Sequence, residues 1–141
     1  MQYVPSPSEW VREQVDLYEQ SDGEKGYDIR GYPCVIVTHV GRRSGAIRKS
    51  PLIRVVHGGK YVLVASMGGA PADPQWAHNL RAEPDIAVRD KAEVLDVTAR
   101  EVTDADEHAA VWQVCVDTFP DYADYQGKTA RTIPVFVCEP R

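Results

Sequence analysis

The stretch Cys34–Val56, CVIVTHVGRRSGAIRKSPLIRVV, establishes the β character of this chain. Its first run, Cys34–Thr38, is β-branched and almost continuously apolar, which is typical of a strand covered on both faces. Its second run, Ile47–His57, contains Pro51, which has no N–H for a strand ladder and marks an edge, a bulge or a strand start. The stretch therefore predicts two β-strands joined by a tight turn at Gly41–Gly45.

The turn is framed by two glycines and carries basic side chains. Glycine permits a tight turn with outward-facing N–H groups, and guanidinium groups can hold an anion through paired hydrogen bonds. The donors gathered here are Arg42, Arg43, Ser44, Arg48 and Lys49. A solvated hairpin turn with ordinary surface charge accounts equally well for the spacing, so spacing alone leaves both interpretations open. The clustering of the donors beside one turn favours a bound anion.

Length, composition and net charge limit the class of protein. The chain has 141 residues, 43% of them hydrophobic, which predicts one globular domain over residues 1–141 with a single core. Its 16 basic and 21 acidic residues give a formal net charge of −5. Because nucleic-acid-binding proteins carry broad basic surfaces, this balance argues against a nucleic acid partner. A small anion at the basic turn fits better.

The remaining composition predicts a cytoplasmic protein without a metal site. The three cysteines include no C-x-x-C pair, the four histidines show no metal-binding spacing, and the N-terminus lacks the features of a signal peptide. Residues 1–22 contain an amphipathic helix with Val11, Val15 and Tyr18 on its apolar stripe. We expect this helix to pack on its own domain. Peripheral membrane contact is the minor alternative, because the polar face is acidic.

Beyond the basic turn, short strands alternate with helices. We expect strands at Tyr61–Ser66, at 85–89 and 92–101 as a hairpin, and at Ile133–Cys138. A helix is expected at Pro74–Ala82, with Asp73 as its cap. A second helix is expected from Thr103 to about Thr118, with Thr103 and Asp106 as a capping box. About six strands, mostly antiparallel, with helices packed outside them predict an α+β fold built on a small β-barrel.

Three further groups of residues are candidates for a binding site. The Ser66–Gly69 loop precedes a helix start, Trp76 and Asn79 share a face of that helix, and the Phe119–Tyr125 segment places aromatic residues at spacings of three. Each group also has a structural interpretation, namely a plain connection, a Trp packed in the core and an aromatic lid. No carboxylate pair, Cys–His dyad or P-loop is present. The residues alone thus indicate an anion-binding β-barrel.

Several motifs, in order, resemble the deazaflavin-dependent nitroreductase family. They are Gly41–Gly45 with Arg48 and Pro51, Val64–Gly69, Pro74–Leu80, Phe119–Tyr125 and Arg131–Pro134, and the similarity covers nearly all of Tyr32–Pro140. Members of this family are actinobacterial reductases that use coenzyme F420 on a split β-barrel. The resemblance implies an α+β fold, a mostly antiparallel split β-barrel of the FMN-binding type with flanking helices.

The resemblance also implies roles for individual residues. The basic turn and the strand after it look like the segment that holds the coenzyme's phosphate and acidic tail, and the end of the Tyr61–Ser66 strand looks like the support of the deazaflavin ring. The implied coenzyme-binding residues are Arg42, Arg43, Ser44, Arg48, Lys49, Ser50, Pro51, Leu52, Ile53, Val64, Ala65, Ser66, Met67, Gln75, Trp76, Ala77, His78, Asn79 and Tyr122. Ser66, Tyr122 and Tyr125 are the implied catalytic residues.

The implied reaction is transfer of a hydride from reduced coenzyme F420 to a quinone of the menaquinone type or to a nitroaromatic, with Ser66 or Tyr122 hydrogen-bonding the acceptor. A non-catalytic carrier that binds F420 or FMN on the same barrel is the alternative. Met67 stands where the family commonly has Lys, Ile53 where an aromatic residue is common, and Phe119 where Tyr can occur. The acceptor therefore stays open, as does the oligomeric state.

Overall fold

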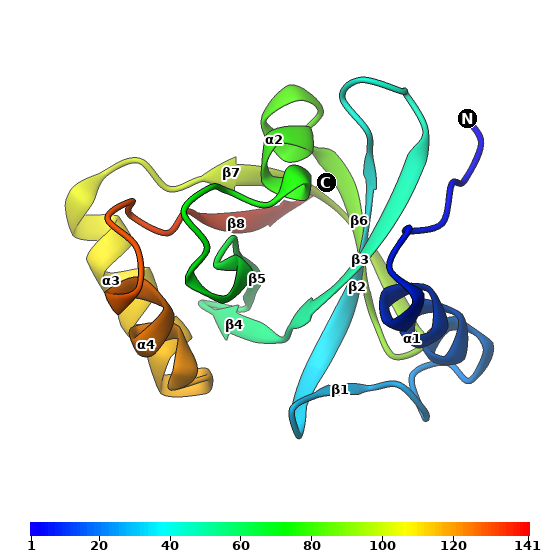
Figure 1. The fold of residues 1–141 in the computed structure, drawn as a ribbon, viewed down its shortest axis with the longest axis horizontal. Helices are drawn as coiled ribbons and strands as arrows, with labels where there is room; N and C mark the ends of the chain where they lie inside the picture. The colour runs from blue at the N-terminus through cyan, green and yellow to red at the C-terminus, as the bar shows by residue number, and fades with distance from the viewer.

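The computed structural model describes residues 1–141 and contains four α-helices, one 3-10 turn and a sheet of eight strands (Figure 1). The helices are α1 (Glu9–Gln20), α2 (Gln75–Ala82), α3 (Ala105–Thr118) and α4 (Asp121–Gly127), and the 3-10 turn is η1 (Met67–Gly69). The strands are β1 (Asp28–Ile29), β2 (Tyr32–Val40), β3 (Ile47–Ile53), β4 (Val55–His57), β5 (Lys60–Val64), β6 (Asp85–Asp90), β7 (Glu93–Glu101) and β8 (Val135–Pro140).

The strands form one antiparallel sheet that curls into a split barrel. The order along the sheet is β1-β2-β6-β7-β8-β5-β4, and β3 also pairs with β2. β3 and β4 are separated only by Arg54, so they form one bent segment. Its first part pairs with β2, and its second part pairs with β5 at the opposite end of the strand order. At this bend the Arg54 N–H donates to the Pro33 carbonyl at 2.8 Å, and Arg54 Nε donates to the Asp90 carboxylate at 2.7 Å. The expected α+β split barrel is confirmed.

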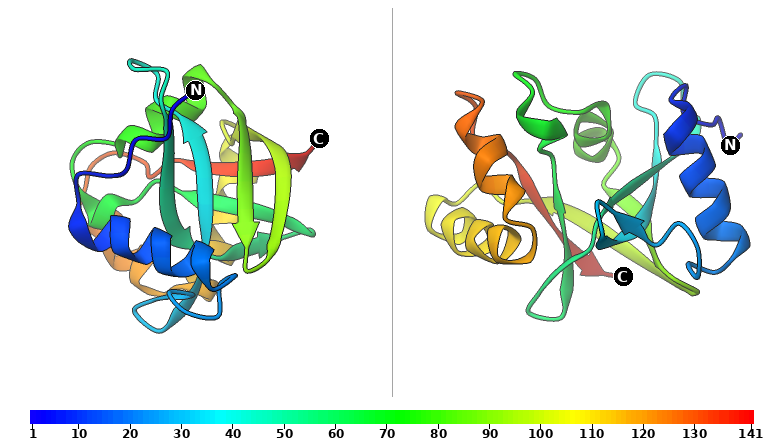
Figure 2. Two further views of the ribbon diagram at one scale, coloured as in Figure 1. Left: turned by 90° about the vertical axis from the view of Figure 1, so that its right-hand side faces the viewer. Right: turned by 60° about the horizontal axis from the view of Figure 1, so that its bottom comes forward.

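The helices cover opposite sides of this barrel. α1 packs on β2 through the buried side chains of Val15 and Tyr18, and α3 and α4 pack on the other side (Figures 1 and 2). α2 contributes Ala77 and Leu80 to the core inside the sheet. All three cysteines are buried free thiols. With these helices in place, β3 runs between α1 on one side and α2 on the other, and the main cleft of the molecule opens along it.

The start of α2 differs from the prediction made from the sequence. The helix begins at Gln75, and Asp73 does not cap it. The Asp73 carboxylate instead pairs with Arg131 at 2.8 Å and with Arg81 at 3.0 Å. Hydrogen bonds between two charged groups are stronger than a bond to a neutral backbone N–H. The guanidinium groups therefore compete successfully for this carboxylate, and the expected cap was wrong.

The start of α3 also differs from the prediction. Its N-cap is Asp104, whose side chain accepts the Glu107 N–H at 2.9 Å. The capping box expected from Thr103 and Asp106 was therefore wrong by one residue. Asp is at least as good an N-cap acceptor as Thr, and with Asp104 in this role an acidic residue, Glu107, occupies the third helical position.

Three features of the chain were not anticipated. The Phe119–Tyr125 segment contains helix α4, which is 7 residues long, too short for a periodic apolar pattern to be recognised. A two-residue strand, β1, precedes Gly31. The expected Ile47–His57 strand is divided at Arg54 into β3 and β4. Each difference arises from a tertiary contact or a bend that spacing along the chain does not record.

Replacing the α3 cap tests its assignment. Asp104→Ala removes the acceptor of the Glu107 N–H and should lower the free energy of unfolding by about 1 kcal/mol. Thr103→Ala, the matched change one residue earlier, should stay within about 0.5 kcal/mol of the wild type. Urea unfolding of both variants measures the difference. A larger loss for Thr103→Ala than for Asp104→Ala would contradict the cap.

Candidate active site

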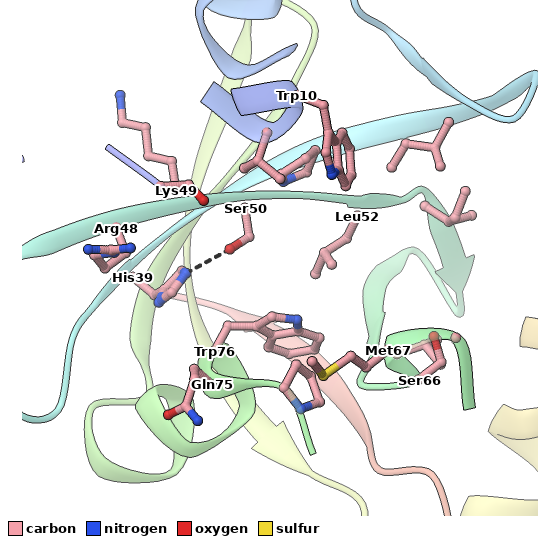
Figure 3. Close-up of a pocket in the computed structure, with 18 of the residues that line it drawn as sticks. Trp10, His39, Arg48, Lys49, Ser50, Leu52, Ser66, Met67, Gln75 and Trp76 are labelled. Carbon is pink, nitrogen blue, oxygen red and sulfur yellow. Dashed lines mark hydrogen bonds between the residues drawn. The ribbon is translucent and has the colours of Figure 1, made fainter. Parts of the chain in front are cut away.

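A cleft of about 620 Å³ opens between α1 and β3 on one side and η1 and α2 on the other (Figure 3). Trp10 from α1 and Trp76 from α2 lie on opposite sides of it, and β3 contributes Arg48 to Ile53 along its length. Although the protein has a net charge of −5, no Asp or Glu lines the cleft. The site therefore suits an anionic or neutral ligand.

Aromatic side chains close one end of the cleft. The Tyr122 ring centroid lies 4.9 Å from that of Phe119 and 6.2 Å from that of Tyr125, in edge-on arrangements. Tyr122 is 4% exposed and lines the cleft. Burial raises the pKa of its hydroxyl, so this group stays protonated and can donate to a ligand. Arg30, from the turn after β1, donates to the Tyr125 hydroxyl at 2.8 Å.

The loop after β5 presents Ser66 and Met67 to the cleft and is held by Arg131. The Arg131 guanidinium donates to the carbonyls of Ala65, Ser66 and Ala70 at 3.2, 2.9 and 2.9 Å. Met67 has a φ of 47°, a left-handed conformation that costs a non-glycine residue roughly 1–2 kcal/mol. The three hydrogen bonds from one guanidinium offset this strain. They fix the loop in the position from which Ser66 faces the cleft.

A buried histidine connects α2 to β3 at the polar end of the cleft. Asn79 Oδ1 accepts the Arg42 N–H at 3.1 Å, Asn79 Nδ2 lies 3.3 Å from His39 Nδ1, and His39 Nε2 lies 3.1 Å from Ser50 Oγ (Figure 3). His39 is 3% exposed. Burial, and to a smaller extent the charge of Arg48, lowers the pKa of His39 to about 4. The imidazole is therefore neutral near pH 7.

The basic residues of the β2–β3 hairpin do not converge on one point. Arg42 Nη1 donates to Gln75 Oε1 at 2.8 Å, and Lys49 pairs with Glu19 of α1 at 2.7 Å. Arg48 lines the cleft without an ion-pair partner. Both Arg48 and Lys49 line the cleft, but the ammonium group of Lys49 is neutralised by Glu19 whereas Arg48 has no acidic partner. The donors that the sequence places together are thus divided among a helix contact, an ion pair and the cleft.

The residues implied by the resemblance fall into two groups. Those that line the cleft are Arg48, Lys49, Ser50, Pro51, Leu52, Ile53, Val64, Ser66, Met67, Gln75, Trp76, Asn79, Tyr122 and Tyr125. The others lie around it. Arg42, Arg43 and Ser44 lie in the hairpin turn, Ala65 and Ala77 are buried in the barrel core, and His78 lies 3.4 Å from Arg81.

Four residues of the site were not assigned a role in it from the sequence. Trp10 was counted only toward an amphipathic helix, His39 only among histidines without metal spacing, and Arg30 was not considered. Arg131 is 61 to 66 residues away in the chain from the carbonyls that it binds. No local motif predicts such a contact. For His39, the one available signal was a titratable residue within an otherwise apolar strand.

The fold and the cleft together define a split-barrel protein with a carboxylate-free cleft lined by basic and aromatic side chains. A model of the F420H(2)-dependent quinone reductase family matches residues 10–140. An F420H(2)-dependent quinone reductase of Mycobacterium tuberculosis is 35% identical over 124 residues, which cover 86% of this chain and 83% of that protein. The chain therefore belongs to the F420H(2)-dependent quinone reductase family, a family of enzymes that depend on reduced coenzyme F420.

Solved structures agree with this membership. A structure of an F420-H2 dependent reductase is 46% identical, covers 76% of this chain and 94% of its own, and superposes with a TM-score of 0.70. Another, described as a domain-swapped dimer, is 43% identical over 95% of this chain and all of its own, with a TM-score of 0.73. A heme storage protein of Vibrio cholerae, at 14% identity and a TM-score of 0.57, shares the fold alone. The expectation of an F420H2-dependent enzyme is confirmed, whereas reduction of nitroaromatics stays a prediction.

The depressed pKa of His39 makes stability depend on pH. The ordinary pKa of 6.5 falls to about 4 in the folded protein, so folding favours the neutral imidazole. The resulting stability is complete above about pH 6.5 and is lost as the pH falls toward 4; at 1.36 kcal/mol per pKa unit it amounts to about 3 kcal/mol.

Comparison with His39→Gln isolates this contribution. Between pH 7 and pH 4 the wild type should lose about 3 kcal/mol more unfolding free energy than His39→Gln, as measured by urea unfolding. Parallel profiles for the wild type and His39→Gln would contradict a buried neutral imidazole.

Proposed function

We propose that this chain catalyses hydride transfer from reduced coenzyme F420, held in the cleft, to a quinone of the menaquinone type. The observation that carries the proposal is the division of the cleft into a polar end with Arg48 and Ser50 and an aromatic end with Tyr122, with no carboxylate between them. A cofactor that performs the hydride transfer itself needs binding, orientation and exclusion of competing reactions, and no acid–base pair from the protein.

The residues present fit an anionic deazaflavin. Arg48 and the Ser50 hydroxyl would hold the phosphate, and Arg43, which is exposed at the hairpin turn, would face the acidic tail. Val64 and Trp76 offer apolar and aromatic surface for the ring. When bound, the coenzyme supplies a hydride from a ring carbon. Every other task in the reaction falls to side chains of this chain.

Tyr122 and Ser66 are the side chains that would act on the acceptor. The Tyr122 hydroxyl is protonated and Tyr122 lines the cleft, so it would donate a hydrogen bond, and then a proton, to the oxygen of a quinone that gains the hydride. Ser66, which also lines the cleft, would bind the ring or the acceptor through its hydroxyl. Arg30 would orient Tyr125 beside them.

An anaerobic assay with reduced coenzyme F420 and menadione tests the proposed activity. Loss of the reduced coenzyme should require the protein and should saturate with both substrates. Binding of the coenzyme without turnover, across several quinones, would overturn the enzyme assignment in favour of a non-catalytic carrier. The same assay with FMN in place of F420 separates the flavin-binding alternative, which predicts comparable affinity for FMN.

Nitroaromatics are the second class of acceptor that we propose. Ile53 and Phe119 are 7% and 3% exposed and give this part of the cleft an apolar character, whereas Met67 is 61% exposed where a Lys would have provided a cation. An apolar pocket without that cation favours a neutral quinone over an anionic or strongly polar acceptor. We therefore expect turnover with menadione to exceed turnover with nitroaromatics.

Membrane contact is a further part of the proposal. None of the helices has the length and apolar character needed to cross a bilayer. Trp10 and Leu17 of α1 are 60% and 44% exposed, and α1 borders the cleft, so a lipid-soluble quinone could enter from a membrane surface that α1 touches. We place the enzyme in the cytoplasm. Co-sedimentation with zwitterionic lipid vesicles should retain the wild type and release Trp10→Ser.

Replacing Tyr122 tests its role as donor to the acceptor. Tyr122→Phe keeps the buried ring and removes only the hydroxyl, so kcat should fall about 100-fold or more while the Kd for coenzyme F420 stays within about twofold. The free energy of unfolding should change little, because the buried ring is kept. An unaltered kcat would remove this hydroxyl from the mechanism.

A further inference from the structure

Four groups form a directed chain of hydrogen bonds that ends at the cleft. The Arg42 N–H donates to Asn79 Oδ1 at 3.1 Å, which identifies the oxygen of this amide. Asn79 Nδ2 is then the atom 3.3 Å from His39 Nδ1, and because an amide nitrogen only donates, Nδ1 must accept. The Nδ1 atom of His39 therefore carries no proton.

The tautomer of His39 follows from that contact. A neutral imidazole with an accepting Nδ1 carries its proton on Nε2, and Nε2 lies 3.1 Å from Ser50 Oγ. The Ser50 oxygen therefore accepts, and its own O–H is left to donate elsewhere. The Ser50 hydroxyl makes no other side-chain hydrogen bond, and Ser50 lines the cleft.

The β2–β3 pairing fixes this geometry. His39 is opposite Arg48 and Val37 is opposite Ser50, so His39 and Ser50 are diagonal neighbours on one face of the strand pair. Arg48 and Ser50 are two residues apart on β3 and point the same way. A neutral donor and a cationic donor thus share one part of the cleft, at the end away from Ser66 and Met67 (Figure 3).

We propose that His39 is a positioning residue that holds the Ser50 hydroxyl as a hydrogen-bond donor toward an anionic phosphate oxygen in the cleft. This inference rests on the proposed function, because the phosphate is that of coenzyme F420. His39 acts on the ligand through the Ser50 hydroxyl. It occupies one of the two lone pairs of the Ser50 oxygen, which favours the orientation in which the O–H faces the ligand, and the buried amide of Asn79 holds the imidazole in that position.

A purely structural role for the same network makes a different prediction. If His39 and Asn79 serve only to satisfy buried polar atoms between the hairpin and α2, removing the Ser50 hydroxyl leaves ligand affinity unchanged. If the chain orients Ser50, the effects of His39 and Ser50 substitutions on affinity must be coupled. A double-mutant cycle measures this coupling directly.

The experiment measures the Kd of coenzyme F420 for the wild type, Ser50→Ala, His39→Leu and the double variant. A hydrogen bond to a charged group is worth roughly 1.5–3 kcal/mol, so Ser50→Ala should weaken binding about tenfold or more. His39→Leu should weaken it by several-fold, and adding it to Ser50→Ala should cause no further loss. An unchanged Kd for Ser50→Ala, or fully additive effects, would overturn the proposal.

Two further binding measurements test the proposal. His39→Gln can present an N–H donor near the position of Nε2, and it should restore the Kd to within about twofold of the wild type. A deazaflavin chromophore that lacks the phosphate and its tail should bind the wild type and Ser50→Ala equally. A loss that persists with this shortened ligand would overturn the phosphate assignment, because Ser50 would then contact the ring.

Controls separate this inference from the proposed function and from misfolding. Thr98→Ala removes a strand hydroxyl that donates to Asp85 at 2.9 Å, away from the cleft, and should leave the Kd unchanged. Ser50→Ala deletes one atom at a partly exposed position, so it keeps the test valid even if His39→Leu fails to fold. Failure of the wild type to bind the coenzyme would refute the proposed function, whereas equal binding by the wild type and Ser50→Ala would refute only this inference.

Discussion

The antiparallel register between β2 and β3 is the constraint on which the cleft depends. It pairs His39 with Arg48 and Val37 with Ser50, which turns one set of side chains toward the cleft and the other toward α1. A slip of β3 by one residue would turn Arg48 and Ser50 away from the cleft and toward α1. Pro51 is tolerated inside β3 because this strand pairs along its length with β2 alone.

Two of the basic side chains of the β2–β3 hairpin have partners within the protein, so the basic groups do not gather at one point of the cleft. Lys49 is neutralised by Glu19, and the Arg42 guanidinium is directed to Gln75, which leaves Arg48 as the β3 cation in the cleft without an ion-pair partner. No carboxylate lines the cleft, so under the proposed function Arg48 and the Ser50 hydroxyl would bind an anion without competition from acidic side chains. At the other end, burial keeps the Tyr122 hydroxyl protonated.

The sequence predicted most of the strands because their apolar runs and turns are local features, and β-branched residues such as those of Cys34–Thr38 leave few alternatives. The α2 cap was wrong because a tertiary partner, Arg131, pairs with the Asp73 carboxylate, and the α3 cap was wrong by one residue because Asp104 accepts the Glu107 N–H in place of Thr103. The basic turn was recognised, but the partners of its side chains depend on α1 and α2, which the local pattern does not contain. Arg131 and His39 act through contacts between distant parts of the chain.

A crystal structure with coenzyme F420 bound is the most direct test of this account. It should place a phosphate oxygen about 3 Å from both Ser50 Oγ and the Arg48 guanidinium, with the ring beside Ser66 and its reacting face toward Tyr122. A coenzyme whose phosphate binds at the hairpin turn beside Arg42 and Arg43, with Ser50 left without a ligand contact, would contradict it.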